Sequence, residues 1–274
     1  MELACKHWPA LNSERAKWLL LHGMGGTGAL WRPLAALLED DFSVLAPDQR
    51  GHGESRVAST PGGRAPASYT PLDYGQDVVE TVEKQSFQPC WVLGHSMGVR
   101  TACAFAHLRP DWVKGLVLID LGFSGVAGGG LGENLAQFIR VLPHHFASRQ
   151  AAREFMHANC PDPSIAQYLM AVSVSGPNGV HFPFDHGALA QTILAARDVS
   201  VREWIRAAAE RGTPILILRG GKSLVWSHEE FEKERALLAG YPSVQFEEFT
   251  DAGHGLPFEK RTELAARLRS FASS

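Results

Sequence analysis

Hydrophobic and polar positions along the chain follow two alternating patterns. Six short runs rich in large apolar residues predict buried strands, at 17–21, 42–46, 90–93, 115–119, 215–218 and 244–249. Between them, apolar residues recur at helical spacing, as in Tyr74, Val78 and Val82, and Thr70 with Asp73 predicts a capping box at the start of that helix. Because buried strands that alternate with helices form doubly wound sheets, we predict an α/β fold with a mainly parallel sheet.

One interval breaks this alternation. Between residues 119 and 214 the strand patterns disappear, and the periodicity predicts helices at 134–142, 149–158, 164–174 and 188–195. A structureless loop of that length is implausible in a compact domain, so we interpret residues 122–211 as an inserted helical cap on a core of residues 1–121 and 212–274. Ligands of open α/β sheets bind beyond the carboxyl ends of the strands, and we expect the cap to be a lid there rather than a mere surface extension.

Composition and charge exclude several function classes. The 274 residues are 45% hydrophobic with a net charge of −3, and no cluster of lysine and arginine marks a nucleic-acid surface. The four cysteines lack the spacing of a metal site, and the N-terminus lacks the pattern of a secretory signal. No apolar run approaches the ~20 residues that span a bilayer. We expect a cytoplasmic protein with no membrane span, no nucleic-acid partner and no metal or other cofactor; the sequence carries no signal of its oligomeric state.

The sequence GHSMG at residues 94–98 carries the strongest chemical signal. It lies between the predicted strand at 90–93 and a helical segment that begins at Val99. In this context the chain must turn sharply at Ser96, and the flanking Gly94 and Gly98 leave room for the turn. The serine hydroxyl then stands exposed at the head of a helix. We therefore predict that Ser96 is a nucleophile on a strand–turn–helix elbow.

A serine nucleophile needs a base within hydrogen-bond reach and a third group that orients the base. His254 is the candidate base, because it lies in a flexible turn between the last predicted strand and the last helix. Two backbone amides are predicted to stabilise the negative charge that develops on the substrate oxygen. One belongs to Met97 at the start of the elbow helix, and the other to Met24 in the glycine-rich loop after the first long strand.

Four segments together closely resemble the α/β-hydrolase superfamily: HGMGG at 22–26, PDQRGHGES at 47–55, GHSMG at 94–98 and DAGH at 251–254. The resemblance runs from about residue 17 to the C-terminus and leaves only the cap unaligned. It implies a sheet of the α/β-hydrolase type with an inserted cap. Asp48, in the second segment, begins a glycine-rich turn, and we interpret it as a structural residue that bonds nearby backbone amides.

The acid of the triad departs from the common pattern of the superfamily. Most members carry it after the penultimate long strand, but residues 219–225 read RGGKSLV and contain no carboxylate. A minor branch of small esterases and thioesterases has the acid at the end of the strand after the elbow helix, where this chain has Asp120. That branch is also similar in a Gly-Gly-x-Ser run, here 220–223, and in a basic residue before Thr-Ala, here 100–102. The resemblance implies Asp120 as the acid, with Glu229 and Glu230 as alternatives.

These residues favour a serine hydrolase that cleaves carboxylic esters or thioesters of small to medium acyl groups. Arg100, Phe123 and Trp226 are candidate substrate-binding residues, the arginine for an acidic group and the rings for an apolar acyl pocket. Two alternatives stay open. The same triad serves C–C bond hydrolases and lyases, which on a keto-acid substrate would need a cation such as Arg100. A non-catalytic receptor that binds a small molecule under the cap would account for the missing carboxylate near Leu224.

Overall fold

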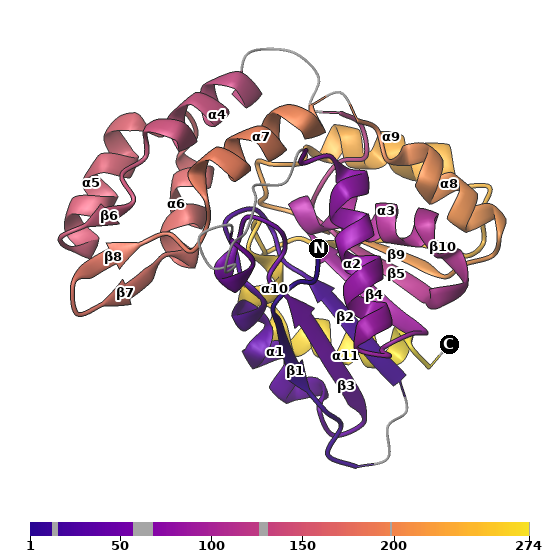
Figure 1. Cartoon of the computed structure of the whole chain (residues 1–274). Coiled ribbons are helices and arrows are strands. Elements are labelled where there is room, and N and C mark those ends of the chain that lie inside the picture. Colours follow the sequence, from indigo (N-terminus) through magenta and orange to yellow (C-terminus); the bar gives the residue numbers. More distant parts are fainter. Residues whose placement is uncertain (13–15, 57–67, 126–130, 198, 274) are drawn as a thin grey trace.

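A seven-stranded sheet forms the centre of the computed structural model, which describes residues 1–12, 16–56, 68–125, 131–197 and 199–273 (Figure 1). Its strand order is β1-β3-β2-β4-β5-β9-β10. The strands are β1 (Cys5–Trp8), β2 (Ala16–Leu21), β3 (Phe42–Pro47), β4 (Cys90–His95), β5 (Val113–Ile119), β9 (Ile215–Gly220) and β10 (Val244–Phe249). All neighbours pair in parallel except β1, which runs antiparallel to β3 at the edge. The predicted doubly wound α/β fold is thus confirmed.

The edge strand β1 was not predicted, and its composition explains why. It is only four residues long, it contains Lys6 and His7, and none of its side chains is fully buried. A short, half-exposed edge strand has neither an apolar run nor a clear alternation. The other six strands bury nearly every side chain or lie beside strands that do, and they begin and end within two residues of the predicted bounds.

Side chains of the strands alternate between two apolar clusters, one on each face of the sheet. Leu19 and Leu21 of β2 belong to the cluster of the face covered by α2 (Pro71–Lys84), α3 (Met97–Leu108), α8 (Arg202–Glu210) and α9 (His228–Leu238). Trp18 and Leu20 belong to the opposite cluster, under α1 (Arg32–Leu38) and α11 (Arg261–Phe271). This two-sided burial holds the carboxyl ends of the parallel strands at one rigid edge.

The start of α2 shows the predicted capping box. The Thr70 hydroxyl accepts a hydrogen bond from the Asp73 amide at 3.3 Å, and the Asp73 carboxylate accepts one from the Thr70 amide at 2.8 Å. Pro71 occupies the first helical position, where its missing N–H costs no hydrogen bond. The local sequence therefore supplies the cap of this helix, and Arg50 from the loop after β3 adds a hydrogen bond to the Asp73 carbonyl at 3.2 Å.

The segment between β5 and β9 forms a lobe beyond one end of the sheet (Figure 1). It contains α4 (Leu131–Val141), α5 (Arg149–Asn159), α6 (Pro163–Val172) and α7 (His186–Ala196), close to the four predicted helices. It also contains a small sheet in the order β6-β8-β7, made of β6 (His145–Phe146), β7 (Val174–Gly176) and β8 (Gly179–His181). Strands of two or three residues are too short to show a period of two, so the sequence did not indicate them.

The lobe has an apolar cluster of its own, which includes Ile139, Met156 and Leu169. The last helix before β9, α8, packs on the sheet and not in this lobe. Ile205 and Ala208 of α8 belong to the core cluster beneath α3, although the predicted cap extended to residue 211. We therefore use "cap lobe" for α4–α7 and β6–β8 and count α8 with the helices that cover the sheet.

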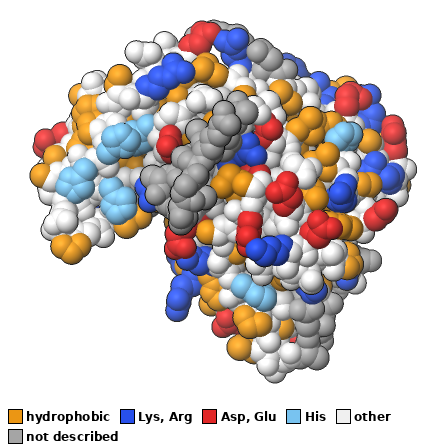
Figure 2. Space-filling view, viewed as in Figure 1, with side chains coloured by type: hydrophobic (Ala, Val, Ile, Leu, Met, Phe, Trp, Pro, Cys, Tyr) orange, Lys and Arg blue, Asp and Glu red, His pale blue; other side chains and the backbone are white. Residues whose placement is uncertain are grey.

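Charged side chains of both signs are interspersed over α2, α8 and α9 on the face shown in Figure 2, and histidine side chains gather on the cap lobe. Mixed surface charge of this kind gives no extended basic stripe on that face. Among the described helices, none has the length and apolar character needed to cross a membrane.

Candidate active site

Ser96 occupies a strained turn between β4 and α3. Its φ is 53°, a left-handed conformation that costs free energy for a residue other than glycine. A Cβ on Gly94 would lie 2.2 Å from the carbonyl oxygen of Gly98, and one on Gly98 would lie 2.3 Å from that of Leu21. Glycine is therefore required at both positions, and the local geometry is that of the predicted elbow.

Three side chains from distant parts of the chain form a continuous row of hydrogen bonds at the carboxyl edge of the sheet. His254 Nε2 lies 3.1 Å from Ser96 Oγ, and His254 Nδ1 lies 2.7 Å from Asp120 Oδ2. A buried carboxylate only accepts, so Nδ1 carries the ring proton and Nε2 accepts from the serine hydroxyl. The structure thus brings together the predicted nucleophile, base and acid.

Asp120 is fully buried directly after β5, with φ at 55°. Its carboxylate also accepts a hydrogen bond from the Ser223 hydroxyl at 2.5 Å and another from the Gly220 amide at 3.1 Å. These donors compensate for the removal of the charge from water. The sequence had indicated residues 220–223 only as a resemblance, and the role of Ser223 as a donor to the acid was missed.

The alternative acids lie elsewhere. Glu229 and Glu230 are exposed at the start of α9. The carboxylate of Glu229 pairs with Lys233 at 2.7 Å, and that of Glu230 accepts a hydrogen bond from Ser227 at 3.3 Å. Neither contacts His254 among the interactions of the described residues, whereas Asp120 bonds its Nδ1.

The two predicted oxyanion donors flank Ser96 in space. Met97 is the first residue of α3, so its backbone N–H has no partner within the helix. Met24 lies in a tight turn that is closed by a hydrogen bond from the Gly26 amide to the Gly23 carbonyl at 3.1 Å, with Gly25 at φ 77°. Both methionines line the same cavity as Ser96. The arrangement can present two backbone donors to one oxygen atom.

Two buried histidines support the Met24 loop. His22 Nε2 accepts a hydrogen bond from the Gln49 amide at 3.0 Å, and His52 Nε2 accepts one from the Gly25 amide at 3.0 Å. Burial lowers the pKa of His22 to about 4 and that of His52 to about 3, which keeps both rings neutral and able to accept. Sequence reasoning missed both roles, because a histidine in a loop carries no pattern.

Asp48 has the structural role that the sequence predicted. Its carboxylate accepts hydrogen bonds from the amides of Gly28 at 2.7 Å and Glu54 at 2.8 Å. It therefore ties together two loops at the carboxyl edge of the sheet, those after β2 and after β3.

His95, the residue before the serine, supports the base. Its Nε2 donates to the backbone carbonyl of His254 at 2.7 Å, while its Nδ1 has no partner among the described residues. Burial lowers the pKa of His95 to about 3. A neutral, fully buried ring thus fixes the turn that presents His254.

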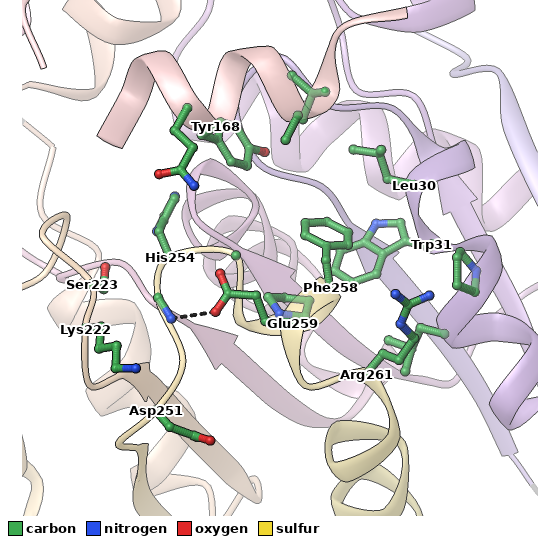
Figure 3. Close-up of a pocket in the computed structure, with 18 of the residues that line it drawn as sticks. Leu30, Trp31, Tyr168, Lys222, Ser223, Asp251, His254, Phe258, Glu259 and Arg261 are labelled. Atoms are coloured by element: carbon green, nitrogen blue, oxygen red, sulfur yellow. Dashed lines mark hydrogen bonds between the residues drawn. The ribbon is translucent and has the colours of Figure 1, made fainter. Parts of the chain in front are cut away.

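Two cavities share the candidate base, His254, as a lining residue. The smaller, of about 240 Å³, holds Ser96 and both oxyanion candidates under apolar residues of the cap lobe. The larger, of about 870 Å³, lies between α6, the Leu30–Trp31 turn and α10 (Leu256–Glu259), with Trp31 and Phe258 on one side and His254 on the other (Figure 3). Tyr168, Leu224 and His254 line both cavities.

The predicted substrate-binding residues differ in their positions. Arg100 lines the smaller cavity, but its guanidinium donates to the backbone carbonyls of Val199 at 2.5 Å and Ser124 at 2.7 Å. Burial lowers the pKa of Arg100. The prediction that Phe123 and Trp226 line an acyl pocket is wrong: both are buried in the core with ring centroids 5.4 Å apart and line neither cavity. Apolar periodicity cannot separate a core ring from a pocket ring.

Within the described residues, no group of three or more histidine, cysteine, aspartate or glutamate side chains could hold a metal ion.

Comparisons with known proteins identify the family. Residues 19–261 match the family model for the alpha/beta hydrolase fold. The chain is 26% identical over 253 residues to the esterase YbfF of Escherichia coli, covering 92% of this chain and 91% of that protein. It is 27% identical over 229 residues to a 2-(acetamidomethylene)succinate hydrolase of Mesorhizobium japonicum, covering 82% and 78%. A solved structure of a marine microorganism esterase superposes with a TM-score of 0.74 at 19% identity, covering 98% of this chain and 99% of that one.

Proposed function

Because the chain belongs to the α/β-hydrolase family, we propose that it is a serine hydrolase of carboxylic esters or thioesters with small to medium acyl groups. The observation that carries the proposal is the row of hydrogen bonds from Ser96 Oγ through His254 to the buried Asp120 carboxylate. A hydroxyl, an imidazole and a carboxylate in this order are the parts that acyl transfer requires.

Acylation begins when Ser96 Oγ attacks the acyl carbon and its proton passes to His254 Nε2. The Asp120 carboxylate stabilises the imidazolium that forms and holds its tautomer. The amides of Met24 and Met97 donate to the oxygen of the tetrahedral intermediate. The intermediate then collapses, the bond to the leaving oxygen or sulfur breaks, and His254 returns the proton to that atom.

Deacylation repeats these steps with water. His254 takes a proton from a water molecule, the resulting hydroxide attacks the ester of Ser96, and the carboxylic acid departs as Ser96 regains its proton. The volume of the cavity beside Ser96, about 240 Å³, supports an acyl group of small to medium size.

The four unpaired cysteines support our expectation of a reducing, cytoplasmic compartment.

Two features weigh against a C–C bond hydrolase or lyase and against a non-catalytic receptor. A keto-acid substrate needs a cation to bind its carboxylate, but Nη1 and Nη2 of Arg100 are already engaged with backbone carbonyls. A receptor has no need for a strained serine aligned with a base and a buried acid. Both features favour hydrolysis of an ester or thioester.

A fluorophosphonate probe tests the proposal directly. We expect stoichiometric labelling of Ser96 in the native protein and none in His254→Ala, because without a base the hydroxyl is a poor nucleophile. Turnover of p-nitrophenyl esters and acyl-CoA thioesters across chain lengths then separates ester from thioester substrates. Absence of labelling in the native, folded protein would overturn the proposal in favour of a receptor.

A further inference from the structure

The larger cavity has no role in the chemistry described so far. On the premise that Ser96 forms an acyl-enzyme, we propose that this cavity receives the leaving group, and that the leaving group is a bulky, largely apolar alcohol or thiol. The substrate would then be asymmetric, with an acyl part that fits about 240 Å³ and a leaving group that fits a site of about 870 Å³.

The chemistry of proton return decides which cavity serves which part. The oxyanion donors and Ser96 line only the smaller cavity, so the acyl carbon and its chain are held there. The proton that His254 Nε2 takes must be delivered to the atom that departs, so that atom faces the His254 ring. The larger cavity is lined by His254 and shares Tyr168 and Leu224 with the smaller one, so a group that departs past the His254 ring can enter it.

The walls of the larger cavity indicate the class of leaving group. Apolar side chains dominate, among them Leu30, Leu34, Val172, Pro257 and Phe258. Four charged side chains also line it. Glu259 accepts the Gly253 amide at 2.7 Å, as Figure 3 shows, and Asp251 pairs with Lys260 at 2.5 Å. Lys222 and Arg261 are the two basic residues of the lining. An apolar group therefore meets matching surface on the wall opposite the base.

Esters with leaving groups of similar basicity test this assignment. Ethyl butyrate, 2-(2-naphthyl)ethyl butyrate and ethyl decanoate vary the alcohol and the acid separately. We expect the naphthylethyl ester to exceed ethyl butyrate in kcat/KM by about 10-fold or more, since a filled apolar pocket is worth on the order of 1–3 kcal/mol. Ethyl decanoate should show no comparable gain over ethyl butyrate, because a decanoyl chain takes up most of the smaller cavity.

Alanines in the two linings allow each cavity to be blocked. Ala171→Trp on α6 narrows the larger cavity, and Ala29→Trp does so from the opposite wall. Each should lower the preference for the naphthylethyl ester by about 10-fold. Ala196→Trp narrows the smaller cavity and should instead lower kcat/KM more for ethyl decanoate than for ethyl butyrate. Ala236→Trp, an exposed position on α9 outside both linings, is the matched control and should leave both ratios as in the native protein.

The outcomes separate the two levels of the argument. If Ser96 is labelled by the fluorophosphonate but both blocks at Ala171 and Ala29 leave the alcohol preference intact, the cavity assignment is overturned and the hydrolase stands. An exchange of effects, with Ala171→Trp changing acyl-length preference and Ala196→Trp changing alcohol preference, overturns it as well. An unlabelled Ser96 overturns both the assignment and the proposed function.

A second, independent observation concerns Tyr168 of α6. Its hydroxyl is buried and has no hydrogen-bond partner among the described residues. A Cβ on Gly23 would lie 2.7 Å from this hydroxyl and 3.0 Å from Ser96 Cβ, so the hydroxyl faces the space beside the nucleophile. A buried polar group without a partner is costly, which indicates that a ligand supplies the partner. We infer that Tyr168 donates a hydrogen bond to the substrate at the scissile group.

The position and chemistry of Tyr168 fit that role. Its ring contacts His254 edge-on at 5.4 Å, and the residue lines both cavities, so it stands where they join. Burial raises the pKa of Tyr168, which keeps the hydroxyl protonated and able to donate. The cap lobe would thereby contribute a group to the reaction itself.

Tyr168→Phe tests the inference, because it removes only the hydroxyl. We expect kcat to fall by about 10²-fold with little change in KM, as for loss of one donor to the transition state. The melting temperature should stay the same or rise, because an unsatisfied buried hydroxyl disappears. Tyr241→Phe, whose hydroxyl bonds Glu210 at 3.2 Å outside both cavities, is the control. If Tyr168→Phe keeps a kcat within twofold of native, or loses kcat in step with a lower melting temperature, the inference that Tyr168 donates to the substrate is overturned.

Discussion

The carboxylate of Asp120 is held by three donors, which come from two other segments of the chain, residues 220–223 and His254. His254, Ser223 and Gly220 all donate to it at distances of 2.5 to 3.1 Å. Because the group is fully buried, it cannot exchange these partners for water. Its orientation toward His254 Nδ1 therefore follows from packing rather than from local preference.

Asp120→Asn tests this residue as the acid. The amide no longer requires a proton on Nδ1 of His254, so the tautomer that cannot accept from Ser96 is favoured. We expect kcat to fall by about 10⁴-fold while the protein stays folded, measured with a p-nitrophenyl ester and circular dichroism. Glu229→Gln, at an exposed position paired with Lys233, is the control and should keep native turnover. The reverse result would assign the acid to α9.

The elbow between β4 and α3 is the element on which the site depends. Backbone atoms approach Gly94 and Gly98 so closely that any side chain would displace a neighbouring strand or helix. The same element binds the cap lobe, because Arg100 of α3 donates to Ser124 and Val199, which lie at the two ends of the cap segment. The nucleophile and the cap entrance are thus parts of one rigid unit.

Gly98→Ala should damage this element. The new Cβ would lie 2.3 Å from the Leu21 carbonyl oxygen, so β2 and α3 would have to move apart. We expect a loss of about 1–3 kcal/mol in the free energy of unfolding, by urea titration, together with a loss of fluorophosphonate labelling. Gly240→Ala is the matched control, because no atom lies within 4 Å of its added Cβ. Equal stability of the two variants would contradict the close approach.

At the scale of the whole molecule, buried neutral histidines link stability to pH. Burial lowers the pKa of His22 to about 4, and those of His52 and His95 to about 3. In the unfolded chain a histidine titrates near about 6.5. Between these values the unfolded chain binds protons that the folded chain does not, so stability is full above about pH 6.5 and is lost as the pH falls toward 4.

The expected size of this effect is about 1.4 kcal/mol for each buried histidine per pH unit below about 6.5. Urea unfolding at pH 7.5 and pH 5.5 should therefore show a lower free energy of unfolding at the acidic value. His52→Gln should reduce the difference between the two pH values, whereas replacement of the exposed His7 by Gln should preserve it. Equal stability at both pH values would show that the rings are protonated in the folded state.

The sequence by itself determined the elements whose signals are local. The six predicted strands, the capped start of α2, the elbow glycines and the turn that carries His254 all follow from apolar runs or from residue types with special backbone needs. Motif resemblance extended this to Asp120, which has no local signal of its own. The family and the fold were therefore predictable from the chain alone.

Tertiary structure decided everything that depends on atoms brought together from far apart. Ser223 reaches Asp120 across 103 positions, and His95 holds the His254 turn across 159. The same apolar character put Phe123 in the core and Phe258 in a cavity wall, because burial depends on which elements pack together. Periodicity records which side of an element is apolar, but only packing determines whether that side meets another element or an open space for a substrate.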